Sequence, residues 1–333
     1  MAQTVVVIPG DGIGPEVMEA AVKVVKASQA PIKWQTHVLG MQAIKQEGTA
    51  VPKETLAAIT KHKVALKGPT TTPTGTGHIS ANVQLRRQLN LYACIRPVIT
   101  LPAVSTRYNN VDLVVVRENT QGLYQGLEIE PAKGISIAMK VVTKQGCQRI
   151  AEAAFAYAQQ HKRRRITIGH KANILKANDG MLLQQTQRVA KKYPDITCDH
   201  RLVDALCMQL VQDPTQFDML LLPNLYGDIV SDLCAGFVGG LGLVPGANLG
   251  KDMAVFEAVH GTAPDIAGRN CANPLAAIQS ACLMLHHLSY HQQAHRIQAA
   301  VQTVLRQQHM RTVDLGGTAT TTDFTQAIVE NMK

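Results

Sequence analysis

The chain has 333 residues, of which 33 are Lys or Arg and 24 are Asp or Glu, giving a formal net charge of +9. Hydrophobic residues make up 46% of the sequence and charged residues 17%, which is too much core material and too little charge for disorder. Length and composition therefore predict one large folded domain or two of ordinary size.

Apolar periodicity alternates along the chain between short strand-like runs and amphipathic stretches, which predicts an α/β protein with helices covering a sheet. The predicted strands are 4–8, 33–39, 63–66, 111–116, 135–141, 166–169, 196–203, 218–222 and 253–257. The predicted helices are 15–28, 52–61, 80–89, 145–160, 179–193, 205–212, 274–289 and 291–307. No Gly/Ser-rich or Pro-rich linker divides the chain, so two domains would have to be connected by chain crossings.

Cellular location is predicted from the start of the chain and from its cysteines. The sequence enters the run 4–8 without the basic, apolar and cleavage regions of a secretory signal or an Arg-rich leader, so we expect a cytoplasmic protein. The longest apolar runs, such as 113–116 and 219–222, are strand-sized, which predicts no membrane segment. The seven cysteines are widely spread and form no CxxC pair, which favours free thiols in a reducing compartment.

A glycine loop at 9–16 joins the first strand to the first helix. It lacks the third glycine of a GxGxxG motif, because that position is Pro15, and no acidic residue ends the strand near residue 38. A Rossmann-type nucleotide site is therefore not expected. Pro15 suits a first helical turn, so the loop is either a structural connection or a part of the chain near a cofactor.

Three arginines are candidates for binding an anion. A hydroxyl-rich loop at 67–78 is followed by Asn82 and Arg86, which share one face of a helix because they are four residues apart. We expect Arg96 at the end of a short strand and Arg117 at the end of a strongly apolar one. Singly, each arginine is more often a surface charge. If the three guanidinium groups converge, they can grip carboxylates bidentately and select a ligand with several of them.

Two acids and a lysine suggest metal binding and proton transfer. Asp228 and Asp232 are four residues apart among apolar neighbours, so they share a helical face where their charges repel unless a cation lies between them. Carboxylate oxygens suit Mg²⁺ or Mn²⁺, although a solvated helix face has the same spacing. Lys171 follows an apolar strand, where it either takes part in chemistry or only ends a sheet edge.

Positive charge is most concentrated at 161–165, between a helix-like and a strand-like segment. Basic groups in that place suit the negative end of a helix dipole. Aromatic residues, which would stack on bases, are only 4% of the chain, and no zinc-finger or RNP-like motif is present. We therefore expect no nucleic-acid partner and keep nucleic-acid binding as the weaker alternative.

Together these motifs resemble those of the β-decarboxylating dehydrogenases, which are the isocitrate, homoisocitrate and 3-isopropylmalate dehydrogenases. Similarity runs in order from about residue 4 to the C-terminus and is greatest to NAD-dependent isocitrate dehydrogenase. The strings that carry it are 9–16, 80–97, 117–124, 170–173, 224–228 and 260–265.

That resemblance implies an isopropylmalate dehydrogenase-like, doubly wound α/β fold with two domains interleaved in sequence and a non-Rossmann cofactor site. Residues 1–97 with 236–333 would form a large cofactor-binding domain. Residues 98–235 would form a small domain that carries the dimer interface and the metal ligands. The implied assembly is a homodimer in which each active site borrows Lys171 and Asp204 from the other subunit.

The implied activity is NAD-dependent oxidative decarboxylation of isocitrate to 2-oxoglutarate and CO₂ with Mg²⁺ or Mn²⁺. In this family the lysine matching Lys171 assists removal of the hydroxyl proton, and the tyrosine matching Tyr124 returns a proton after decarboxylation. The implied substrate-binding residues are Ser80, Asn82, Arg86, Arg96, Arg117, Tyr124, Lys171 and Asn173. The implied metal ligands are Asp204, Asp228 and Asp232. The implied cofactor-binding residues are Thr72, Asn82, Glu257, His260, Gly261, Thr262, Ala263, Asp265, Ile266 and Asn273.

Cofactor and substrate choice follow from a few positions. NADP-using relatives carry Lys and Tyr where this chain has Asp265 and Ile266, and an Asp accepts hydrogen bonds from a ribose 2′-hydroxyl but repels a 2′-phosphate. Ser80 and Asn82 replace the apolar residues of isopropylmalate enzymes, so isocitrate is expected first, homoisocitrate second and 3-isopropylmalate third. A non-catalytic regulatory subunit of a hetero-oligomeric isocitrate dehydrogenase is the alternative from another class.

Overall fold

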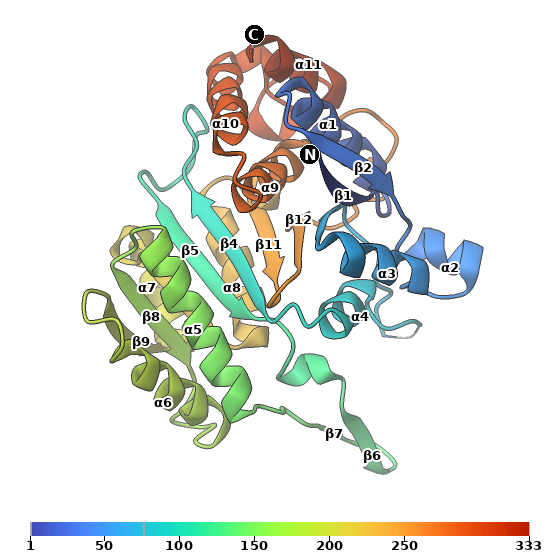
Figure 1. Cartoon of the computed structure of the whole chain (residues 1–333). Helices are drawn as coiled ribbons and strands as arrows, with labels where there is room; N and C mark the ends of the chain where they lie inside the picture. Colours follow the sequence, from blue (N-terminus) through green and yellow to red (C-terminus); the bar gives the residue numbers. More distant parts are fainter. Residues whose placement is uncertain (1, 76, 333) are drawn as a thin grey trace.

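A computed structural model describes residues 2–75 and 77–332 and confirms the predicted α/β class (Figure 1). The strands of its large sheet are β1 (Gln3–Ile8), β2 (Ile32–Thr36), β3 (Val64–Lys67), β4 (Ala93–Ile99), β5 (Asp112–Glu118), β8 (Arg165–His170), β9 (Thr197–Leu202), β10 (Met219–Leu222), β11 (Pro245–Leu249) and β12 (Ala254–Ala258). Their order is β2-β1-β3-β12-β11-β4-β5-β10-β8-β9. Antiparallel pairing along β12-β11-β4-β5 joins two parallel outer parts into one mixed sheet.

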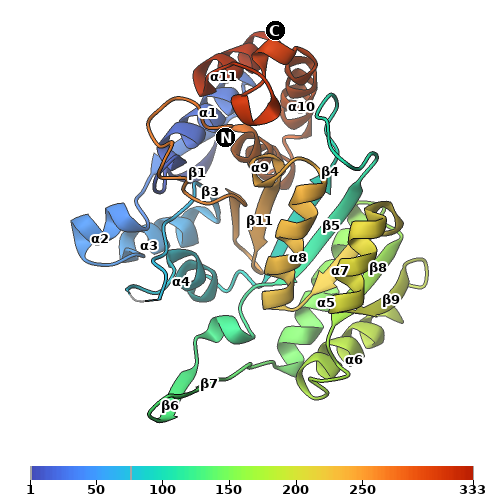
Figure 2. The same ribbon diagram turned by 180° about the vertical axis from the view of Figure 1, so that it is seen from behind.

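Helices cover both faces of this sheet, as a doubly wound fold requires. The helices are α1 (Gly14–Ala27), α2 (Met41–Glu47), α3 (Lys53–His62), α4 (Ala81–Gln88), α5 (Lys144–Gln160), α6 (Asn178–Ala190), α7 (Val203–Gln212), α8 (Asn224–Phe237), α9 (Leu275–His287), α10 (His291–Arg306) and α11 (Thr321–Glu330). One continuous apolar core joins α1, α5, α6, α9, α10 and α11 to the sheet. On the opposite face lie α3 with α4 and, farther along the sheet, α7 with α8 (Figure 2). Each pair of helices covers its own apolar cluster.

Alternation along the strands explains the gap between these two clusters. Neighbouring side chains of a strand point to opposite faces, so Val114 and Val116 enter the continuous core while Leu113 and Val115 face α7 and α8. On that second face the positions between the two clusters are polar or ionisable instead of apolar. They are Lys67, Cys94, Arg96, Arg117, Asn248 and Glu257. The sheet therefore carries a polar patch at the centre of an otherwise apolar face.

Several predicted elements need correction. The predicted strand 33–39 ends at Thr36, and the predicted strand 135–141 ends at Ala138. The predicted ranges omitted β4, β6 (Glu128–Ala132), β11, α2, α8 and α11. Arg96 lies in the middle of β4 and not at its end, because β4 continues through Pro97 to Ile99.

A hairpin of β6 and β7 (Ile135–Ala138) extends away from the body of the molecule (Figure 1). Its strands are exposed along their whole length, although they carry Ile129, Ile135 and Ile137. The predicted domain boundaries stay a prediction, since one sheet runs through both parts. Within the described residues, no helix combines the length and the apolar character that crossing a membrane requires.

Candidate functional site

A cavity of about 350 Å³ lies over the polar patch, between α4 and α8. Its lining comes from the first, middle and last parts of the chain, because β3, β12, β4 and β5 meet there. The predicted site residues that line it are Thr72, Ser80, Asn82, Arg86, Arg96, Arg117, Tyr124, Asp228, Glu257, His260 and Gly261. Sequence analysis thus named most of the polar lining, and their roles stay predictions.

The three predicted arginines converge in this cavity. Arg86 of α4, Arg96 of β4 and Arg117 of β5 are all at least nine-tenths buried. Burial lowers the pKa of Arg117, and the neighbouring charge of Arg86 lowers it further. Three guanidinium groups held this close repel one another, and a bound ligand with several carboxylates would relieve that repulsion.

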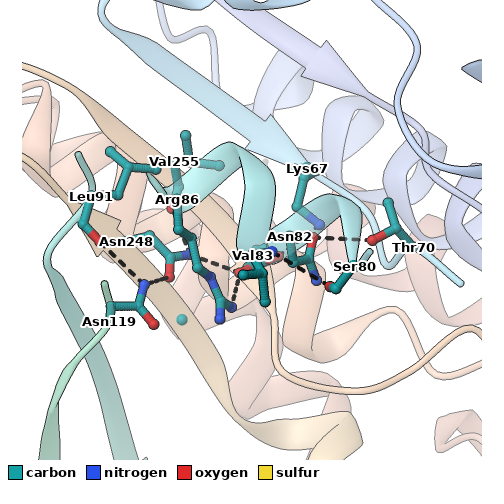
Figure 3. Close-up of polar contacts among 12 residues, drawn as sticks. Lys67, Thr70, Ser80, Asn82, Val83, Arg86, Leu91, Asn119, Asn248 and Val255 are labelled. Atoms are coloured by element: carbon teal, nitrogen blue, oxygen red, sulfur yellow. Dashed lines mark hydrogen bonds and ion pairs between the residues drawn. The ribbon is translucent and has the colours of Figure 1, made fainter. Parts of the chain in front are cut away.

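A buried network holds Arg86 in place. Glu257 on β12 accepts a hydrogen bond from Nη2 of Arg86 at 2.8 Å and pairs with Nζ of Lys67 at 2.7 Å. Asn248 donates to the same Glu257 at 2.8 Å and accepts from Asn119 at 2.9 Å (Figure 3). Burial alone would raise the pKa of Glu257, but Lys67 and Arg86 outweigh it and hold that pKa far below its usual range. Glu257 is therefore a carboxylate with two cationic partners.

Replacing Glu257 by glutamine is expected to lower the free energy of unfolding by about 3–5 kcal/mol, because it leaves two buried cations without their counter-charge. Since the folded-state pKa lies below the unfolded value of about 4.3, this contribution is present above that pH and is lost as the pH falls. Urea unfolding of the wild type and the variant at pH 7 and pH 3.5 measures this difference in the free energy of unfolding, which should be smaller at pH 3.5. Glu54→Gln, at an exposed glutamate of α3, is the control and should change little.

Ser80 and Asn82 lie at the mouth of the cavity, at the start of α4. The hydroxyl of Ser80 caps the helix by accepting from the amide of Val83 at 3.4 Å, which leaves its own hydrogen free to donate. Asn82 accepts from the hydroxyl of Thr70 at 3.0 Å, so its amide hydrogens stay available (Figure 3). Both residues can therefore donate hydrogen bonds to a ligand that reaches this side of the cavity.

Tyr124 and Asp228 meet on the opposite side of the cavity. The hydroxyl of Tyr124 donates a hydrogen bond to Asp228, and the other carboxylate oxygen of Asp228 pairs with Arg117. Burial and this carboxylate raise the pKa of Tyr124, so its hydroxyl keeps its proton at neutral pH. Burial alone would raise the pKa of Asp228, but Arg117 outweighs it and the pKa is lowered.

A glycine allows α8 to approach this close. A Cβ at Gly227 would lie 2.6 Å from Cγ of Arg117, so any side chain there would displace the arginine. Nε and Nη2 of Arg117 donate to Oδ1 of Asn224, at 3.0 and 2.8 Å, one turn earlier on the same helix. The helix therefore fixes the position of the guanidinium group.

The two acids of α8 have the donor chemistry of a magnesium or manganese site. Asp228 is half-buried, and Asp232 lies beside Arg96, 3.4 Å from its Nη1. Burial raises the pKa of Asp232. Among residues 2–75 and 77–332, no three His, Cys, Asp or Glu side chains gather as a metal site, and the metal-binding role of Asp228 and Asp232 stays a prediction.

Several predicted residues do not line the cavity. Lys171 follows β8, and its Nζ lies 2.6 Å from Oδ1 of Asp204 on α7, whose pKa it lowers. The amide of Lys171 donates to the buried Asp179, which also pairs with Lys140. The predicted residues outside the lining are Lys171, Asn173, Asp204, Asp232, Thr262, Ala263, Asp265, Ile266 and Asn273.

The predicted cofactor loop packs against the glycine loop. The carbonyl of Thr262 accepts from the amide of Ile13 at 2.9 Å, and a Cβ at Gly12 would lie 2.0 Å from that oxygen. Gly12 also has a φ of +59°, which glycine adopts without strain. The glycine loop is thus a close structural connection that also lies beside the predicted cofactor loop, and its role near a cofactor stays a prediction. Asn273 is held by Asp314, whose carboxylate accepts from its amide at 2.9 Å.

Sequence analysis missed Lys67, Cys94 and Asn248, which take part in the cavity or in its supporting network. Lys67 ends the wholly buried strand β3. A lysine at the end of a buried strand could have predicted a buried ion pair from the sequence, because a buried ammonium group requires a carboxylate partner. Cys94 and Asn248 give no comparable signal, since their place depends on strand pairing between distant parts of the chain.

Fold and cavity together define an α/β protein with a cationic site over the middle of its sheet, suited to a small polycarboxylate. The chain belongs to the isocitrate/isopropylmalate dehydrogenase family, whose model matches residues 4–328, and the predicted family is confirmed. It is 48% identical over 99% of its length to the mitochondrial NAD isocitrate dehydrogenase catalytic subunit 5 of Arabidopsis thaliana, covering 88% of that protein. It is 49% identical over 99% of its length to a mitochondrial NAD isocitrate dehydrogenase regulatory subunit of Dictyostelium discoideum, covering 92% of it. The crystal structure of isocitrate dehydrogenase from Methylococcus capsulatus matches with a TM-score of 0.96 and 46% identity, covering 100% of this chain and 99% of that one.

These relatives overturn the predicted cytoplasmic location. Both NAD isocitrate dehydrogenase subunits described above are mitochondrial proteins. The prediction relied on the first residues of the chain and on its scattered cysteines, neither of which identifies a compartment by itself.

Proposed function

We propose that this chain is a catalytic NAD-dependent isocitrate dehydrogenase, which oxidises and decarboxylates isocitrate to 2-oxoglutarate and CO₂ with a divalent metal ion. The observation that carries the proposal is the convergence of Arg86, Arg96 and Arg117 beside Tyr124 and Asp228 in one cavity. This arrangement combines grips for several carboxylates with a protonated acid and a metal-binding carboxylate.

In this proposal isocitrate fits the cavity lining better than homoisocitrate or 3-isopropylmalate does. The three arginines can hold two carboxylates, and Ser80 and Asn82 can donate hydrogen bonds to the third. An isopropyl group at that position would leave both donors unpaired, which makes 3-isopropylmalate a poor substrate. Homoisocitrate differs by one methylene, usually worth about 1–3 kcal/mol, and is the second candidate.

The residues of the chain divide the proton transfers between them. Asp228 and Asp232, with Asp204 of a second copy, would hold a divalent ion that would supply charge stabilisation to the substrate oxygens, and NAD bound beside the cavity would supply the hydride acceptor. Lys171 of a second copy takes the hydroxyl proton during this oxidation. The arginines, together with Ser80 and Asn82, hold the two carboxylates that remain, and the arginines orient the carboxylate that leaves as CO₂. Tyr124 then donates its hydroxyl proton to the carbon that lost CO₂, which completes the 2-oxo acid.

NAD would lie along the loop that begins at Glu257. Gly261 is at the cavity lining, and among the described residues no atom beyond its two chain neighbours lies within 4 Å of where its Cβ would be, so the backbone there leaves room for a ligand. Further along the loop, Asp265 would accept from the ribose 2′-hydroxyl and repel a 2′-phosphate.

Replacing Asp265 by lysine and Ile266 by tyrosine together is expected to shift the ratio of kcat/KM for NADP over NAD upward by at least about tenfold, because the new cation attracts the 2′-phosphate. Initial rates with isocitrate and each cofactor measure the shift. The single variant Ile266→Tyr, which leaves the carboxylate in place, is the control. An unchanged ratio in the double variant would place the adenosine end elsewhere.

An activity assay of the purified chain, without any other subunit, distinguishes a catalytic role from a regulatory one. A regulatory relative is as similar to this chain as a catalytic one. Support for the catalytic role comes from the complete set Arg86, Arg96, Arg117, Tyr124, Lys171, Asp204, Asp228 and Asp232. The test is kcat/KM of the purified chain for isocitrate, homoisocitrate and 3-isopropylmalate, each with NAD and NADP. No turnover of isocitrate with NAD and metal would contradict the proposal.

The partner in this proposal is a second copy of the chain, so that the active enzyme is at least a homodimer. Support comes from Lys171 and Asp204, which lie outside the cavity that needs them. Exposed apolar side chains on α7 and α8, Met208 at 50% and Ile229 at 58%, provide a surface for that copy. The exposed hairpin β6–β7 provides another.

A further inference from the structure

A second cavity, of about 510 Å³, lies where α5 ends and where α6 connects to β9. Its lining comes from residues 158–164 and 192–196, and it shares no residue with the first cavity. Sequence analysis singled out part of this segment as the most basic stretch of the chain. Nothing in the proposed dehydrogenase reaction uses it.

Along the basic stretch, residues that have an acidic partner alternate with residues that have none. Arg163 pairs with Asp112 and with Asp218, and Arg165 pairs with Asp199. Lys162 precedes Arg163, and Arg164 lies between Arg163 and Arg165. Neither forms an ion pair within the part of the chain that the structure describes. Both line the cavity beside the paired Arg163, so the lining contains two cations without an acidic partner among the described residues.

A third cation completes the rim from another segment. Lys192 follows α6 and lines the same cavity, and its only ion pair among the described residues is a loose one, 3.9 Å from exposed Glu152. Asp195 is the one acid in the lining, against the paired Arg163 and the three cations Lys162, Arg164 and Lys192. The cavity therefore keeps a net positive charge that favours a multiply charged anion.

The backbone that presents these cations is fixed. Asp218 accepts from the amide of Arg164 at 2.7 Å and from that of Arg165 at 3.0 Å. The carbonyl of Arg164 accepts from the amide of Thr197 at 2.8 Å, which joins the two segments of the lining. Tyr193 stacks on Phe155 of the core with ring centres 5.1 Å apart. Less ordering is then needed on binding, which favours affinity.

We propose that this second cavity binds a compact polyphosphate group, whose oxygens are contacted by Lys162, Arg164 and Lys192. Guanidinium and ammonium groups are the usual partners of phosphate oxygens, and cations from two segments suit a chain of several phosphates. Inorganic tripolyphosphate and the triphosphate of a nucleotide share this chemistry.

The test is isothermal titration of the full chain with tripolyphosphate at 0.15 M salt, for the wild type and for Lys162→Gln/Arg164→Gln. The control is Lys45→Gln/Lys61→Gln, which removes the same charge from exposed positions on α2 and α3. We expect the dissociation constant to rise at least about tenfold in the cavity variant and to change little in the control, since two charge-assisted hydrogen bonds are lost. Circular dichroism should show an unchanged fold for both.

Each other outcome overturns the proposal. Equal weakening in both variants would mean that net charge alone attracts the anion, and no weakening in the cavity variant would mean that tripolyphosphate binds elsewhere. No heat of binding by the wild type at about 1 mM ligand would exclude a site of useful affinity. ATP should show the same dependence on Lys162 and Arg164. If citrate does so with equal affinity, the assignment to phosphate is wrong.

Discussion

Replacing Tyr124 by phenylalanine is expected to lower kcat for isocitrate by about 10²–10³-fold while KM changes little. The variant keeps the aromatic ring against Arg117 and removes only the hydroxyl that donates to Asp228. Because burial and Asp228 raise the pKa of Tyr124, the hydroxyl of the wild type is protonated at neutral pH and can serve as the acid.

Steady-state formation of NADH at saturating metal measures this effect. Tyr157→Phe, on α5 and outside the cavity, is the matched control and should keep kcat. A fall in kcat shared by both variants would indicate a general loss of folded protein. If Tyr124→Phe keeps kcat within about threefold of the wild type, another group supplies the proton.

Lys171→Ala and Asp228→Asn chains, each expected to lose nearly all activity alone, should recover about a quarter of wild-type activity when unfolded together and reassembled as a 1:1 mixture. Random pairing makes half of the dimers mixed, and each mixed dimer has one site with its own Asp228 and the other copy's Lys171. Its second site carries both changes and stays inactive.

Mixing Asp228→Asn with Arg96→Gln is the matched control. Both changes affect the cavity side of the site, so neither site of a mixed dimer is intact and no activity should return. No recovery in the first mixture would show that Lys171 does not act across a dimer. Recovery in the control mixture would show that the cavity itself is assembled from two copies.

The outer strands and most helices were predictable because their patterns are regular. Strand β5 is an apolar run with full alternation between two cores, and α1 and α10 each present one apolar face. Of the central strands, β11 was missed and β4 was expected only as a short strand ending at Arg96, for a functional reason. Arg96 and Asn248 interrupt the apolar pattern because they face the cavity, and Pro97 is unusual inside a strand.

Site residues were predictable where a motif survives in sequence. The strings around Arg86, Arg117 and Asp228 could be read directly, whereas the contacts of Lys67 with Glu257 could not. These two residues are far apart in the chain and meet only because β3 and β12 pair in parallel. The proposed roles of Lys171 and Asp204 require a second copy, which no pattern within one chain can place.

The polar patch on the central strands has a consequence for how binding and folding are linked. Its members come from residues 67 to 257, so the cavity exists only when the chain from β3 to β12 is folded. A fragment that ends before β11 lacks Asn248 and Glu257 and leaves Arg86 without its counter-charge. Occupancy by a tricarboxylate should therefore protect distant segments together against hydrogen exchange, as one cooperative unit rather than a local one.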